Sequence, residues 1–204
     1  MQLPKANEEK FWAGVTQVGE FFMGSSDVRK ALLALAQTLD RLNVPYAIVG
    51  AMALNEAGYR RATADVDVLL TTAGLATLKA DCLGRGYVEK FPGSRGLRDT
   101  IHNVTIDVVI AGEYPGDGKP KPVSFPDPAI AKRGELVALL PIEKLIELKL
   151  ASGLSAPHRL RDLADVQELV KHARLPRDLG ERIDASVRMK YFELWESAQF
   201  VERE

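Results

Sequence analysis

The chain has a single cysteine, no long apolar run and no excess of positive charge. Its only cysteine is Cys82, which excludes a disulfide framework and a thiolate metal cluster and fits a reducing cytosol. No apolar run approaches the roughly 18 residues of a membrane span, and the first residues do not read as a secretory signal. The formal net charge of −1 supplies no global basic field for nucleic acid. We therefore expect a cytoplasmic protein without membrane contact.

What is present is ordinary globular composition. The 204 residues are 46% hydrophobic and 27% charged, which suits one domain with a small helical appendage. Alternating helical and strand-like segments predict an α/β (α+β) fold, in which a small mixed β-sheet is flanked by helices and carries N- and C-terminal helical extensions. We place the N-terminal extension at 1–43, the core at 44–140 and the C-terminal helical region at 141–204.

Hydrophobic periodicity and breaker residues define the expected elements. Residues 112–128 are dense in glycine and proline and predict a long loop. Aromatic residues near both ends, Phe192 and Trp195 among them, are expected to pack on the core, with a self-association surface as the alternative. Helices are expected over 5–23, 27–42, 51–59, 73–84, 141–153, 159–173 and the tail from 177, and strands over 46–49, 66–70, 87–91, 104–110 and 136–140.

Two carboxylates mark the second strand as a candidate site. Asp65 and Asp67 are two residues apart, so both leave the same face of a strand. An isolated Asp-x-Asp is usually surface charge or turn chemistry, but Val66 and Val68 indicate a buried strand. Like charges on one face of a buried strand repel unless a cation compensates them. The pattern therefore favours a metal site for Mg²⁺ carrying a nucleoside triphosphate.

A third carboxylate lies inside the apolar strand VTIDVVI. An unpaired Asp107 there would cost several kcal/mol, so it needs a partner. One interpretation is an ion pair with Arg95 or Arg98. The other makes Asp107 a metal ligand from an adjacent strand that also accepts the proton of an incoming hydroxyl.

The residues between the first two strands complete the pattern. Gly50 allows a sharp turn close to a ligand, and the N–H groups of Gly50 and Ala51 at a helix start suit a phosphate. Arg61 and Thr63 are either a solvated turn or a brace for the loop or a phosphate. Each feature alone is weak evidence for a nucleotide site. The prediction depends on their order along the chain, which is glycine, helix, arginine and paired aspartates.

These positions resemble the minimal nucleotidyltransferases of the polymerase-β superfamily, in which an apolar strand, Gly-[Gly/Ser], a short helix and Arg-x-Thr-x-Asp-x-Asp precede a third carboxylate. Ala51 departs from that pattern and removes a serine hydroxyl contact. The stretch 143–166 resembles the later motifs of abortive-infection AbiEii-type toxins, and the resemblance spans about residues 30–172. The matching positions are Gly50-Ala51, Arg61-Ala62-Thr63-Ala64-Asp65-Val66-Asp67, Asp107, Glu143-Lys144, Lys149 and Arg161 to Val166.

The resemblance implies a nucleotidyltransferase core at 44–140 and a Mg²⁺-dependent transfer of a nucleoside monophosphate from a nucleoside triphosphate to a hydroxyl. It implies two Mg²⁺ ions, with Mn²⁺ as a substitute, an RNA, tRNA or protein acceptor, and an antitoxin partner. The implied roles are metal binding by Asp65, Asp67 and Asp107, catalysis by these three and Lys149, and nucleotide or phosphate contacts from Gly50, Ala51, Arg61, Thr63, Lys149, Arg161 and Asp162.

Two other functions stay open. One is a small-molecule transferase of the kind that modifies antibiotics, and the other is a non-catalytic nucleotide-binding module. An RNA acceptor would require clustered basic residues. Four basic residues flank the loop over 112–128 and favour RNA: Lys119, Lys121, Lys132 and Arg133. The presence of all three carboxylates argues against a module that only binds.

Overall fold

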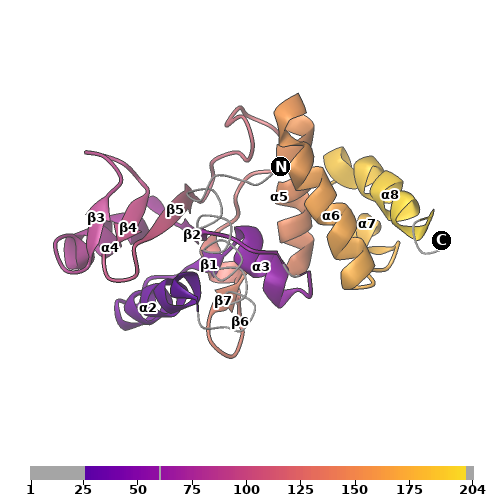
Figure 1. The fold of residues 1–204 in the computed structure, drawn as a ribbon. Coiled ribbons are helices and arrows are strands. Elements are labelled where there is room, and N and C mark those ends of the chain that lie inside the picture. The colour runs from indigo at the N-terminus through magenta and orange to yellow at the C-terminus, as the bar shows by residue number, and fades with distance from the viewer. Residues whose placement is uncertain (1–25, 60, 201–204) are drawn as a thin grey trace, which may run out of the picture.

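The computed structural model describes residues 26–59 and 61–200 (Figure 1). The helix predicted over 5–23 lies outside these residues. None of the helices within the described ranges is long and apolar enough to cross a membrane. These helices are α2 Asp27–Arg41, α3 Gly50–Glu56, α4 Thr72–Cys82, α5 Ile142–Ser155, α6 Leu160–His172, α7 Leu179–Arg182 and α8 Ala185–Phe200, with 3₁₀ turns η1 Pro128–Ile130 and η2 Pro157–Arg159.

A mixed sheet of seven strands runs through the described part of the chain in the order β3-β4-β5-β2-β1-β7-β6. β2 and β5 pair in parallel from Asp65↔Thr105 to Leu70↔Ile110. β1 is antiparallel to β2 and parallel to β7. The predicted mixed α/β fold is therefore confirmed. The strands are β1 Ala47–Ile48, β2 Asp65–Leu70, β3 Tyr87–Glu89, β4 Leu97–Asp99, β5 Val104–Ile110, β6 Lys132–Arg133 and β7 Ala138–Leu139.

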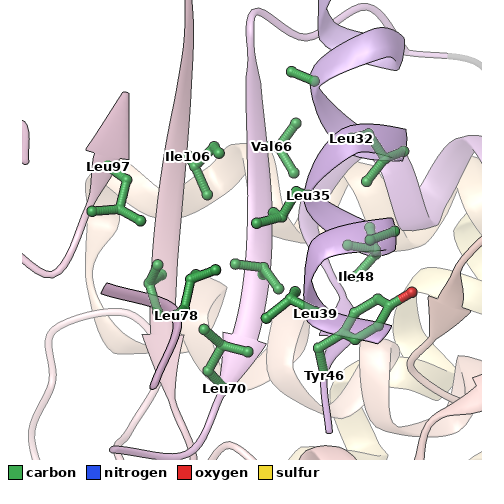
Figure 2. Close-up of a cluster of buried hydrophobic side chains, with 14 of the residues drawn as sticks. Leu32, Leu35, Leu39, Tyr46, Ile48, Val66, Leu70, Leu78, Leu97 and Ile106 are labelled. Atoms are coloured by element: carbon green, nitrogen blue, oxygen red, sulfur yellow. The ribbon is translucent and has the colours of Figure 1, made fainter. Parts of the chain in front are cut away.

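One face of the sheet is covered by α2 and α4. Ser26 caps α2, because its Oγ accepts the Arg29 N–H over 3.3 Å. The leucines of α2 recur at helical spacing and meet the alternate apolar residues of the central strands. Figure 2 shows this cluster, with Leu32, Leu35, Leu39, Tyr46, Ile48, Val66, Leu70, Leu78, Leu97 and Ile106 labelled.

The other face of the sheet packs against α3 and the C-terminal helices. Leu69 of β2 and Leu54 of α3 belong to one buried cluster with Leu150 of α5 and Leu169 of α6. In Figure 1, α5 to α8 stand side by side at the end of the molecule opposite β3 and β4. The sheet is thus the middle layer between two helical layers, and each of its faces has its own core.

The C-terminal tail packs on this second core, as its aromatic residues predicted. Trp195 of α8 is partly buried and donates its Nε1–H to the Leu175 carbonyl over 2.8 Å. Tyr191 is fully buried and donates to the Pro176 carbonyl over 2.9 Å. These bonds tie α8 to the segment that follows α6.

Two strands were not predicted from the sequence. β4 has three residues and β6 has two, which is too short for alternation to be recognised. β4 exists because Leu97 and Asp99 pair antiparallel with β5 at Ile106 and Val104. With β4 on one side and β2 on the other, β5 is an interior strand, as its apolar sequence predicted.

Candidate active site

The three predicted carboxylates come from two neighbouring parallel strands. Asp65 and Asp67 lie on β2 and Asp107 lies on β5, and Asp67 and Asp107 are direct partners in the strand register. Leu69 and Val109, which share their side of these strands, pack into the core formed with α5 and α6. The three carboxylates therefore leave the sheet on the face that the C-terminal helices cover.

Asp67 is the carboxylate that its surroundings neutralise least. Burial first, and then the charges of Asp65 and Asp107, raises its pKa from 3.8 to about 6, although Lys149 and Arg61 act in the opposite direction. No hydrogen-bond or ion-pair partner of its side chain is found among the described residues. Its negative charge is therefore costly unless a cation shares the site.

Gly50 brings the backbone against the Asp67 side chain where α3 begins. Its φ of +64° lies in the left-handed region, and a Cβ at this position would overlap with Oδ2 of Asp67. The Val49 N–H donates to the Asp67 carbonyl over 3.1 Å, which fixes β1 against β2 at this point. Gly50 is thus required both for its backbone conformation and for the space that Asp67 occupies.

A cavity of about 250 Å³ lies beside Gly50 and Asp67 and extends to α5, α6 and the long loop. Of the predicted site residues, Gly50, Asp67, Lys149 and Asp162 line it. The others, Ala51, Arg61, Thr63, Asp65, Asp107 and Arg161, are not part of its lining. The complete lining is Val49, Gly50, Asp67, Val109, Pro115, Gly116, Phe125, Leu145, Leu148, Lys149, Ser152, Arg159 and Asp162.

Lys149 is held by two carboxylates of α6. Its Nζ lies 2.7 Å from Oδ1 of Asp162 and 2.8 Å from Oδ2 of Asp165. Burial alone would raise the pKa of Asp162, but Lys149 and a 2.7 Å hydrogen bond from the Ser152 hydroxyl bring that pKa below its ordinary value. Asp165 is only 3% exposed, so this side of α6 is not a solvated face despite its charges.

Arg61 joins the loop before β2 to the same network. Its Nη1 lies 2.6 Å from Oδ2 of Asp165, the oxygen that Lys149 also contacts. The Asn55 amide holds the Arg61 backbone through bonds of 2.6 Å to its N–H and 2.8 Å to its carbonyl. The Arg61 Nε is buried and lacks a hydrogen-bond partner in the described part of the chain. Arg61 therefore braces this loop, one of the two roles expected for it.

Thr63 and Asp107 have partners of their own. The Thr63 hydroxyl donates to Oδ1 of Asp65, which fixes the first carboxylate at the start of β2. Asp107 pairs with Lys90, whose Nζ lies 2.8 Å from its Oδ1. The predicted alternatives for this pair, Arg95 and Arg98, are wrong, because their guanidinium groups contact Glu113 and Asn103 instead.

Several residues of the site carried no recognisable sequence signal. Lys90 and Asn55 act through contacts that require the folded loops. Asp165 lies in the motif stretch Arg161 to Val166 but had no predicted role, although its position three residues after Asp162 places both carboxylates on one helical face. Arg161 lies on the exposed side of α6, and Arg159, two residues earlier, lines the cavity instead.

The donor chemistry of the three aspartates fits a hard divalent cation, since carboxylate oxygens are the ligands that Mg²⁺ takes. The raised pKa of Asp67 shows that burial and its two carboxylate neighbours leave its charge without adequate compensation. As the side chains stand, however, no three acidic, histidine or cysteine groups in the described ranges are gathered closely enough to hold an ion. Thr63 and Lys90 occupy oxygens of Asp65 and Asp107, respectively.

Comparisons with known proteins give only distant likenesses. No family model matches the chain, and no curated protein matches it. The antibiotic-resistance factor ANT(2'')-Ia is similar in its solution structure, with a TM-score of 0.48 and 16% identity over 84% of this chain and 98% of that chain. Its crystal structure with adenylyl-2''-tobramycin gives a TM-score of 0.47 and 14% identity over 83% and 99%. JHP933 from Helicobacter pylori gives 0.46 and 17% over 87% and 92%. At these values the likeness carries no argument about activity.

Proposed function

We propose that the protein is a Mg²⁺-dependent nucleotidyltransferase that moves a nucleoside monophosphate from a nucleoside triphosphate to a hydroxyl acceptor. The observation that carries the proposal is the in-register pair Asp67 and Asp107, with Asp65 beside it, next to a cavity that Gly50 and Lys149 line. Carboxylates that share one face beside a phosphate-sized cavity are what a metal–triphosphate complex needs.

In this proposal Asp65, Asp67 and Asp107 hold Mg²⁺, as two ions, and Mn²⁺ can substitute. Bound metal supplies charge neutralisation for the triphosphate and lowers the pKa of the acceptor hydroxyl. Asp107 takes the hydroxyl proton, the hydroxyl oxygen forms a bond to the α-phosphorus, and the bond from that phosphorus to the bridging oxygen breaks. Pyrophosphate leaves with the bonding electrons.

The cavity positions the triphosphate. It holds about 250 Å³ beside Asp67, and in this proposal the N–H groups of Gly50 and Ala51 donate to phosphate oxygens. Lys149 adds positive charge near the leaving pyrophosphate. Asp162 and Asp165 hold Lys149 in place, so the charge is positioned before the substrate arrives.

The acceptor must supply the hydroxyl that attacks the α-phosphorus. We propose RNA, tRNA or a protein, as for an AbiEii-like toxin with an antitoxin partner. One observation favours the small-molecule alternative: the four basic residues expected to attract RNA do not form one patch. Lys119 and Lys121 line a separate cavity of about 360 Å³, and Lys121 is paired with Asp117. Lys132 and Arg133 form β6 at the sheet edge, where Arg133 pairs with Asp40.

The test is label transfer from each of the four α-³²P nucleoside triphosphates in the presence of Mg²⁺. Parallel reactions contain total RNA, a mixture of proteins, or hydroxylated amines of the antibiotic type. Asp67→Asn is the inactive variant, because it removes the central carboxylate with little change of volume. Asp178→Asn is the matched control, because it makes the same change at an exposed position of the C-terminal region.

We expect transfer by the wild type and by Asp178→Asn, and a loss of at least about 100-fold in Asp67→Asn. The reaction that accepts label identifies the acceptor class. Transfer that survives in Asp67→Asn would refute the assignment of the site. Binding of a triphosphate without transfer to any acceptor would leave the protein a nucleotide-binding module.

A further inference from the structure

Within the described residues, the one cation in direct contact with a carboxylate of β2 or β5 is Lys90, which pairs with Asp107. It follows β3 immediately, and its Nζ lies 2.8 Å from Oδ1 of Asp107. The two side chains are 38% and 40% exposed, so water reaches the pair and the contact can exchange. No recognised sequence motif contains Lys90, and the proposed transfer reaction assigns it no role.

The backbone is shaped to let Lys90 reach this carboxylate. The Lys90 N–H donates to the Gly96 carbonyl over 3.1 Å, which closes the loop between β3 and β4. A Cβ at Gly96 would lie 2.6 Å from Cδ of Lys90 and 3.3 Å from Oδ1 of Asp107. Any larger residue at this position would therefore push the lysine stem away from Asp107.

The other basic side chains around this hairpin have different partners. Lys79 contacts Glu89 and the Ser94 carbonyl, each over 2.6 Å. Arg95 pairs with Glu113. Lys90 alone among these three turns toward the candidate metal ligands, so the contact is specific to its position and does not follow from the general charge of the hairpin.

We infer that Lys90 is an exchangeable counter-ion of Asp107, and that its ion pair and a bound divalent cation exclude one another. The inference rests on the metal site of the proposed function. An ammonium and a divalent ion on one carboxylate repel each other strongly at a separation of a few ångström. Metal binding therefore displaces Lys90, and the pair keeps Asp107 neutralised when no metal is bound.

Two contacts hold oxygens of the candidate metal ligands in this structure. One oxygen of Asp107 accepts the Lys90 ammonium, and one oxygen of Asp65 accepts the Thr63 hydroxyl. A hydroxyl can rotate its hydrogen away and leave the oxygen free. An ammonium carries its charge with it and must move. Lys90 is thus the contact that competes with a cation.

Mn²⁺ affinity of the nucleotide-free protein, measured by electron paramagnetic resonance of the free ion, tests the inference. Lys90→Met keeps the apolar stem over Gly96 and removes the charge. Arg95→Met is the matched control, because it removes a positive charge from the same loop without touching Asp107. We expect Lys90→Met to bind Mn²⁺ about two- to five-fold more tightly, the factor that corresponds to an exposed ion pair of up to about 1 kcal/mol, and Arg95→Met to change it by less.

A second measurement follows Lys90 itself. In protein with ¹³C-dimethylated lysines, the resonance that Lys90→Arg removes should shift toward that of a free lysine as Mg²⁺ is added. The counter-ion inference alone would be overturned by either of two results. One is equal Mn²⁺ affinity in wild type and Lys90→Met, and the other is a Lys90 resonance that does not shift when the site is saturated with Mg²⁺. The metal site of the proposed function would instead be overturned if wild type and Lys90→Met bound no Mn²⁺, or if Asp67→Asn left the Mn²⁺ affinity of both proteins unchanged.

Discussion

Replacing Asp67 with asparagine should make the metal-free protein more stable at neutral pH. The reason is the carboxylate's position: burial and the charges of Asp65 and Asp107 raise its pKa to about 6. Between pH 3.8 and about 6 the folded state therefore binds more protons at Asp67 than the unfolded state does. Stability contributed by this group falls as pH rises through that window and stays low above it.

The size of the effect follows from the same pKa. The difference between about 6 and 3.8 corresponds to about 3 kcal/mol at about 1.36 kcal/mol for each pH unit. This is an upper limit, because an asparagine amide in the same place must also find hydrogen bonds. For a chain of this length, each kcal/mol moves Tm by about 2–4 °C. We expect the Asp67→Asn variant to gain about 1–3 kcal/mol at pH 8 and almost nothing at pH 3.5.

The assay is urea unfolding followed by circular dichroism at pH 8 and pH 3.5, without divalent metal. Asp99→Asn is the control, since Asp99 is a more deeply buried carboxylate, 2% exposed, that contacts His102 and two backbone N–H groups. That variant should lose stability. An Asp67→Asn protein that is less stable than wild type at pH 8 would refute the reasoning. Added Mg²⁺ should stabilise the wild type and reverse the order of the two proteins.

Two further substitutions test the surroundings of Asp67. Gly50→Ala combines a φ of +64° with an overlap with Asp67 Oδ2, so it should cost about 1–3 kcal/mol by urea unfolding. Stability equal to wild type would show that the turn is not built as described. Lys149→Met leaves Asp162 and Asp165 without their shared cation and should lower the free energy of unfolding by about 2–4 kcal/mol. An NMR titration of this variant should find the pKa of Asp67 raised further, since Lys149 lowers that pKa in the wild type. An unchanged pKa of Asp67 would show that the charge of Lys149 does not act on this carboxylate.

The candidate site contains a carboxylate that lowers the stability of the metal-free protein at neutral pH. Asp67 is partly buried near like charges, whereas Lys149 and Arg61 each pair with Asp165. An uncompensated carboxylate beside a rigid, compensated network is typical of a place that is completed by a ligand.

Much of the fold could be predicted from the sequence, because most elements carry a local pattern. The leucine stripe of α2 and its serine cap are readable within a few residues. The apolar run 104–110 became β5 with the predicted bounds. β4 and β6 could not be predicted, since residues as few as two or three become strands only when a longer partner supplies the hydrogen bonds.

For the candidate site, the sequence by itself determined which side chains share a face. The spacing of Asp65 and Asp67 and the period of a strand fix that result without reference to any other segment. The overlap that makes Gly50 necessary, by contrast, requires the register of β1 on β2. No local rule contains that information.

The partners of the charged groups were decided only by the tertiary structure. Lys90 lies 17 residues from Asp107, and Arg61 lies 104 residues from Asp165. Sequence patterns specify periodicity over one helix or strand, and an ion pair depends on where two such elements are brought together. The sequence therefore determined the strand carboxylates. The packing of the β3–β4 loop decided that Lys90 pairs with Asp107, and the packing of α6 against α5 decided that Asp165 pairs with Arg61 and Lys149.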